Sequence, residues 1–279
     1  MKYRVMRTSE VLRIAAVSAV LACATAWVCP AASALDASQT VKPGDATPDE
    51  IFRSANKSLR QGDTTGAIKL LEEAAETGHP GALWVLGDHY RHGDGVPVDN
   101  AKAFQIFNEI ANGHADDSPS SPQAPFVASA FVALGSYYLT GVADSTIKPN
   151  VEEARRLLKY AASYFGDREA QFKLGQIYAD PNSADRDPTE AARWLTLAAR
   201  KGHPGAQALL GQLLFAGDAT VPRRPLLGLM WLTIARAHAS GPTDDWIREM
   251  QEEAFSVAGE NERRQAVKLS QEWIAKNQP

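Results

Sequence analysis

Apolar and small residues recur along the chain at the spacing of one helix face. Five stretches place them at positions i, i+3, i+4, i+7 and i+8, starting at Ala67, Ala103, Ala154, Ala191 and Leu227. This spacing is typical of a helix that buries one side and exposes the other. The pattern therefore predicts five amphipathic helices.

A second pattern precedes four of these helices. It runs Ala-x3-Leu-Gly-x2-Tyr, with Leu in place of Tyr in the last copy, and its leucines are Leu86, Leu134, Leu174 and Leu210. From each leucine to the start of the following helix face there are 17, 20, 17 and 17 residues. Such a constant offset predicts repeated antiparallel helix pairs joined by short loops. The small Ala and Gly positions let the paired helices approach closely.

The residues expected to begin and end helices agree with this division. Asp99, Asn150 and Asp187 each stand where a helix should start, and the latter two are followed by a glutamate at the third helical position, which predicts capping boxes. Four glycines suit the left-handed conformation after a last helical turn. They are Gly78, Gly113, Gly166 and Gly202.

The segment from Ala82 to Ala111 carries a specific family resemblance. It combines Leu-Gly at 86–87, Tyr90, Gly-Asp-Gly-Val at 93–96 and the capped helix after Asp99. This order resembles the Sel1-like repeat family, and the unit at 51–78 is similar to a tetratricopeptide hairpin. The resemblance implies an all-α fold, a right-handed α-solenoid of helical hairpins.

The domain organisation follows from where the repeat pattern begins, is interrupted and ends. We expect five hairpins over 49–243, with one long loop at 113–127 that is rich in Ser, Pro and Asp, and two capping helices over 244–279. Residues 35–48 are polar and predict a disordered leader.

The amino terminus predicts export. Basic residues lead into an apolar run from Ile14 to Val28, which Ala32-Ser33-Ala34 follows, so we interpret residues 1–34 as a cleavable signal peptide and expect a periplasmic mature protein with no membrane span. The alternative is a lipoprotein processed at Cys23. Both cysteines, Cys23 and Cys29, fall within this segment, and its removal would exclude disulfides and thiolate metal sites.

The charge and the missing motifs narrow the function further. The formal charge of −4 becomes about −7 when four basic residues and Glu10 leave with the presequence, which disfavours nucleic-acid binding. No nucleophile elbow, phosphate loop or zinc-protease motif occurs in the sequence. We therefore expect that the protein is not an enzyme and has no catalytic residue, cofactor or metal.

The adjacent glutamates are interpreted as solvent-exposed helix faces, and most of the aromatic residues as core. These aromatic residues are Trp84, Phe104, Phe107, Trp194 and Trp231.

Five residues on two predicted first helices are candidates for partner binding or switching: His89, Tyr90, His92, Tyr137 and Tyr138. A metal site formed by Asp88, His89, His92 and Asp94 is an alternative to a polar helix end, although sister repeats lack matching ligands. His79, His114 and His203 each follow a glycine and are interpreted as residues of the helix C-terminus, where their charge suits the dipole. The alternative is that these three histidines sense acidity.

The order of features is also similar to the periplasmic negative regulators of exopolysaccharide production in rhizobia. That resemblance implies a protein partner, the periplasmic domain of a membrane sensor histidine kinase, which the solenoid would hold inactive. A periplasmic protease acting on the 115–125 loop would relieve the repression. A general envelope scaffold and a Sel1-like hydrolase remain as alternatives.

Overall fold

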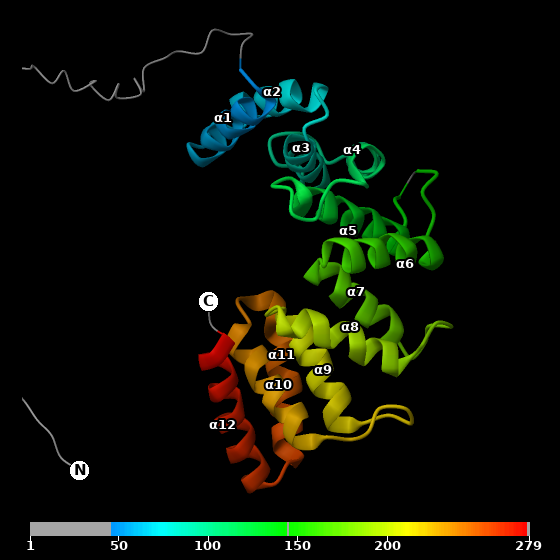
Figure 1. Ribbon diagram of the computed structural model, residues 1–279, viewed down its shortest axis with the longest axis vertical. Coiled ribbons are helices and arrows are strands. Elements are labelled where there is room, and N and C mark those ends of the chain that lie inside the picture. The colour runs from blue at the N-terminus through cyan, green and yellow to red at the C-terminus, as the bar shows by residue number, and fades with distance from the viewer. Residues whose placement is uncertain (1–45, 144, 278–279) are drawn as a thin grey trace, which may run out of the picture. The chain divides into compact units, whose positions relative to one another are not determined.

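The computed structural model describes residues 46–143 and 145–277, and these residues form twelve α-helices and no strand (Figure 1). The predicted signal peptide and most of the predicted leader lie outside the described residues. The helices are α1 (Pro48–Arg60), α2 (Thr64–Glu76), α3 (Pro80–His92), α4 (Asn100–His114), α5 (Ala124–Thr140), α6 (Val151–Tyr160), α7 (Arg168–Ala179), α8 (Pro188–Arg200), α9 (Pro204–Ala216), α10 (Pro225–His238), α11 (Asp245–Val257) and α12 (Glu260–Asn277).

The first ten helices form five consecutive hairpins. Each odd-numbered helix from α1 to α9 packs against the even-numbered helix that follows it, and each later hairpin also packs on the one before. The buried residues are mainly the apolar and small positions of the two sequence patterns, such as Ala103, Leu134 and Leu195. The all-helical repeat architecture predicted from the sequence is therefore confirmed. Among the described residues, no helix is both long and apolar enough to span a membrane.

The helix pairs meet at the predicted small positions. A Cβ atom at the Leu-Gly glycine of a first helix would lie less than 3.0 Å from a large side chain of the second helix, so the two backbones come close only because the glycine has no side chain. These contacts join Gly87 to Phe107, Gly135 to Leu158, Gly175 to Leu195 and Gly211 to Leu232.

The predicted helix starts are confirmed, but their capping boxes are incomplete. The side chains of Asp99, Asn150 and Asp187 each accept a backbone N–H of the first turn of the following helix. The glutamates Glu153 and Glu190, expected to reach back to the cap residues, bind arginines three residues further along instead. An ion pair within the helix replaces the reciprocal bond in both cases.

Gly113 does not end its helix. Gly78, Gly166 and Gly202 have φ values of 76°, 67° and 79°, as predicted, whereas Gly113 lies inside α4, which continues to His114. The segment between α4 and α5 is consequently shorter than the predicted loop at 113–127, since α5 already begins at Ala124.

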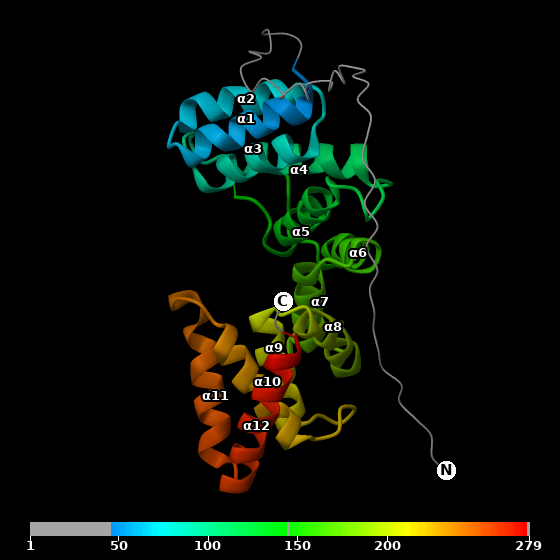
Figure 2. The same ribbon diagram turned by 60° about the vertical axis from the view of Figure 1, so that its left-hand side comes forward.

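The two carboxyl-terminal helices cover the last hairpin from two sides. Helices α11 and α12 both pack on α10 (Figure 2), α11 also packs on α9, and Arg263 of α12 donates to the Phe255 carbonyl of α11 at 3.0 Å. Ile247 of α11 is fully buried, and the Trp273 ring of α12 meets the Trp231 ring edge to face at 5.2 Å. The two predicted capping helices are thus present, and both cover α10 of the last hairpin.

Candidate functional site

First helices of three successive hairpins line a groove of about 310 Å³, which we call the first-helix groove. Helix α5 contributes two serines, a valine and an alanine to its lining, α3 contributes Trp84 and Arg91, and the start of α7 contributes charged groups. Surface grooves of this kind along a helical repeat are suited to a segment of another protein. The lining residues are Trp84, Arg91, Ser129, Val132, Ala133, Ser136, Asp167, Glu169 and Lys173.

Half-buried aromatic rings extend this surface towards the first hairpin. Phe126 of α5 meets Phe52 of α1 edge to face at 5.7 Å and Trp84 of α3 at 6.2 Å. We call these three rings the aromatic strip. Partly exposed Trp, Tyr and Phe side chains dominate the binding energy of many protein interfaces, because they bury a large area at a small entropic cost.

The charges in the groove are paired within the protein. Arg91 forms an ion pair with Asp88 one turn before it, and Glu169 accepts from His203 at 2.8 Å while Lys173 lies 3.5 Å away. The hydrogen bond from His203 lowers the pKa of Glu169 below its ordinary value of 4.5, and the charge of Lys173 acts in the same direction. This contribution to stability is therefore complete above pH 4.5 and is lost as the pH falls through the folded-state pKa.

Three of the predicted site residues lie on α3, outside the groove. His89 is buried, and its Nδ1 contacts the backbone oxygen of Asp94. The Tyr90 ring is also buried, and the Lys102 ammonium lies 3.9 Å from its centre. His92 is exposed, the only one of the five for which this is so. The part of the chain that the structure describes contains no group of three or more His, Cys, Asp or Glu side chains placed to hold a metal ion.

The other two predicted site residues, on α5, pack against the second hairpin. Tyr137 is buried, donates its hydroxyl to Asn100 at 2.9 Å and has its pKa raised by desolvation. Tyr138 is half-buried and meets the Phe104 ring edge to face at 5.6 Å. The five residues therefore do not form one site, and their role in partner binding stays a prediction. The sequence signal that was missed is the spacing of Trp84, Asp88 and Arg91, which places them on one face of α3.

His79 and His203 act at helix starts rather than helix ends. The Nδ1 atom of each accepts the backbone N–H of the third residue after it, Ala82 or Ala206, at 3.1 Å, which makes each histidine the N-cap of its helix. The interpretation of these two residues as C-terminal dipole partners is wrong. An accepting Nδ1 carries no proton, so the ring is neutral and its N–H is on Nε2.

The same arrangement joins hairpins at both places. The Nε2 of His79 lies 2.9 Å from a carboxylate oxygen of Asp49 in the first turn of α1, just as His203 binds Glu169 in the first turn of α7. An aromatic ring three residues after each carboxylate packs on the histidine, with ring centres 4.8 Å apart for Phe52 and 4.2 Å for Phe172. We call each set of carboxylate, phenylalanine and histidine cap a hairpin joint.

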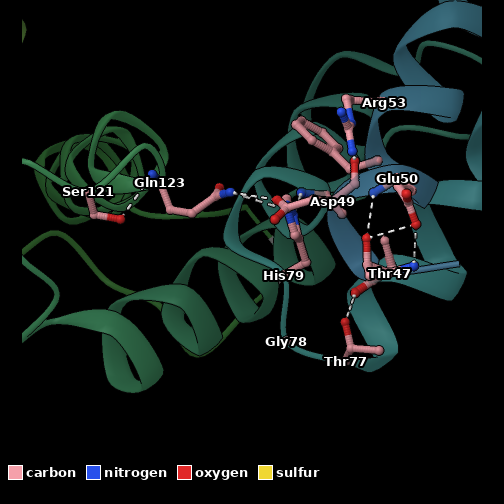
Figure 3. Close-up of polar contacts among 12 residues, drawn as sticks. Thr47, Asp49, Glu50, Arg53, Thr77, Gly78, His79, Ser121 and Gln123 are labelled. Carbon is pink, nitrogen blue, oxygen red and sulfur yellow. Dashed lines mark hydrogen bonds and ion pairs between the residues drawn. The ribbon is translucent and has the colours of Figure 1, made fainter. Parts of the chain in front are cut away.

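The first hairpin joint has an additional member (Figure 3). The Gln123 side chain reaches across from the start of α5 and donates to the same Asp49 oxygen at 3.2 Å. His114 differs from the two capping histidines, because both of its ring nitrogens face oxygen acceptors, the Asp117 carboxylate and the Gly78 carbonyl, each at 3.0 Å. Its doubly protonated ring can donate to both of them.

His203→Ala should lower the free energy of unfolding by about 1 kcal/mol or more, because it removes the N-cap of α9 and the partner of Glu169. His203→Asn should cost less, since asparagine is a preferred N-cap residue and can replace the bond to Ala206. Chemical denaturation with hydrogen exchange in the first turn of α9 measures both. Equal losses in the two variants would show that capping is not what His203 contributes.

The Sel1 repeat family matches the chain at residues 58–79, 80–113, 128–163, 168–203 and 204–239. A Rhizobium leguminosarum bv. viciae protein named exopolysaccharide production negative regulator is 37% identical over 223 residues, 80% of this chain and 81% of its own. Its namesake from Rhizobium meliloti (strain 1021) is 33% identical over 230 residues, 82% and 83% of the two chains. Among solved structures, a protective antigen of uropathogenic Escherichia coli with an SLR fold gives a TM-score of 0.66 at 24% identity, covering 83% of this chain and 46% of that one. The chain belongs to the Sel1 repeat family and is homologous to negative regulators of exopolysaccharide production.

Proposed function

We propose that this protein is a negative regulator of exopolysaccharide production that acts by holding a protein partner in the first-helix groove. The observation that carries the proposal is the relationship to the two rhizobial regulators, which extends over about four fifths of both chains. The groove and the aromatic strip combine aromatic, apolar and charged side chains, the composition typical of surfaces that bind a protein segment.

The partner we propose is the periplasmic domain of a membrane sensor histidine kinase. The basic and apolar start of the chain supports export to the periplasm through a signal peptide. A repressor in that compartment needs a partner that crosses the membrane in order to act on synthesis inside the cell. A sensor kinase bound on its periplasmic side satisfies that requirement, and mass spectrometry of the mature amino terminus tests the compartment.

Crosslinking in native envelopes followed by mass spectrometry tests the partner. Trp84→Ala removes the largest aromatic side chain of the groove, and we expect kinase capture to fall by about 30-fold, the loss typical of a central interface residue. Trp246→Ala is the matched control, because that tryptophan is 36% exposed on α11 and does not line the groove. It should leave capture unchanged.

Two outcomes would contradict the proposal. Capture of the kinase at the wild-type level by a folded Trp84→Ala protein would exclude the groove as the binding surface. Recovery of envelope proteins without any sensor kinase would exclude the kinase and favour a general scaffold. Thermal unfolding of both tryptophan variants separates a loss of binding from a loss of folding.

A further inference from the structure

Residues 115–123 connect α4 to α5, the second hairpin to the third, and they lie close to several other parts of the chain. We call this segment the strap. At one end, the backbone oxygen of Ala115 accepts the Tyr160 hydroxyl of α6 at 2.6 Å. In the middle, Pro119 lines a cleft with Phe165 and Lys201 from the turns that follow α6 and α8. The strap is therefore bonded to the third hairpin and lies beside the end of α8 in the fourth.

The other end of the strap is tied to the first hairpin. Gln123 occupies the N-cap position of α5 but makes no side-chain cap there, unlike His79, Asp167 and His203 at the corresponding helix starts. Its side-chain nitrogen instead donates to Asp49, 74 residues earlier in the sequence. A bond to a charged acceptor is worth more than a neutral one, so this contact can hold α1 in place.

The first hairpin packs on the second through a shared core, in which Ile51, Ala55 and Leu71 join Leu83 and Leu86 of α3. Its polar and aromatic contacts with later helices are made by α1: Asp49 binds His79 and Gln123, and the Phe52 ring packs on His79 and Phe126. These contacts of α1 lie close to Gln123, because its Nε2 is 3.3 Å from the Nε2 of His79 and Phe126 is three residues after it in α5.

We propose that the strap is a latch that fastens the start of α1 to the start of α5, so that release of Gln123 increases local opening of the first hairpin while its core packing on α3 remains. Release would withdraw Phe52 from the aromatic strip and so shorten the surface next to the first-helix groove. This last consequence rests on the proposed function, whereas the latch itself does not. The structure thus assigns a conformational role to the long connection between α4 and α5.

Hydrogen exchange measured by mass spectrometry on the full chain tests the latch. Gln123→Glu places a carboxylate against Asp49, and we expect the amides of α1 and α2 to exchange at least about tenfold faster while α9 to α12 stay unchanged. Gln123→Ala should have the same effect in weaker form. Ser120→Ala is the control, because Ser120 is exposed in the same strap and contacts only Ser118.

A second substitution makes the result specific. Adding Asp49→Asn to Gln123→Glu removes the repulsion and restores a donor opposite the new carboxylate, so protection of α1 and α2 should recover. Unchanged exchange of α1 and α2 in both Gln123 variants would overturn the latch. Faster exchange in all helices at once would also overturn it, because the strap would then support the whole fold. Neither readout depends on the identity of the binding partner.

Discussion

Gly228→Ala is expected to lower the free energy of unfolding by about 3 kcal/mol, because the added Cβ has no space. It would lie 2.6 Å from the backbone nitrogen of Phe215 and 2.7 Å from the backbone oxygen of Gly211, both in α9. A backbone cannot turn aside as a flexible side chain can, so α9 and α10 would have to separate. Urea denaturation followed by circular dichroism measures the loss, and hydrogen exchange should place it in these two helices.

Gly113→Ala is the matched control for this prediction. Gly113 also lies inside a helix, but it is exposed and no atom lies within 4 Å of the position its Cβ would take. Alanine should therefore stabilise the protein by about 0.5–1 kcal/mol through its lower conformational entropy in the unfolded chain. A loss of stability at Gly113, or none at Gly228, would contradict the assignment of close packing to the α9–α10 contact.

Local chemistry explains which parts of the fold were predictable from the sequence. Asp99, Asn150 and Asp187 cap helices through bonds to backbone atoms two or three residues away, and such contacts depend little on the rest of the fold. Pairing of helices was equally predictable, because a constant offset between two apolar patterns repeats along the chain. Gly113 was misjudged since a glycine near a helix end does not show whether the helix continues past it.

The hairpin joints were not predictable by the same rules. Histidine is not among the usual N-cap residues, and the carboxylates that bind His79 and His203 lie 30 and 34 residues earlier in the sequence. One local signal was present: each histidine is followed by a proline, which favours the first position of a helix and so marks the preceding residue as a cap.

The residues that line the candidate groove could not be predicted from the sequence for a different reason. The sequence places Trp84 and Arg91 on one face of α3, but which face meets the next hairpin depends on contacts between helices that are distant in the chain. Trp84 was interpreted as core, and in the structure its half-buried ring lines the groove. Conversely, Tyr90 and Tyr137 were candidates for binding and are buried. Aromatic residues at helical spacing do not by themselves reveal whether they pack inside or face a partner.

Phe107→Ala is expected to cost about 3–5 kcal/mol, the range for removing a fully buried aromatic side chain. The Phe107 ring has no exposed surface, lies against Gly87 of α3 and packs with the Tyr137 ring at 6.4 Å. The Arg91 guanidinium also lies 5.7 Å from its centre, so the cavity would loosen one wall of the groove. Val257→Ala, at a residue that is 73% exposed, should change stability by no more than about 0.5 kcal/mol.

The pair Gly87 and Phe107 provides a stricter test of the same contact. Gly87→Ala alone should be destabilising, because its Cβ would lie 2.8 Å from the Phe107 ring, and that ring is enclosed. In the Phe107→Ala background the nearest remaining atom is Ile106 Cγ2 at 3.3 Å, so the same substitution should cost much less than in the wild type, and alanine is also the better helix former. The double-mutant cycle should therefore give a coupling energy of about 1 kcal/mol or more. Additive effects would mean that Gly87 is not required for the approach of α3 to α4. They would contradict the close-packing role assigned to the Leu-Gly positions.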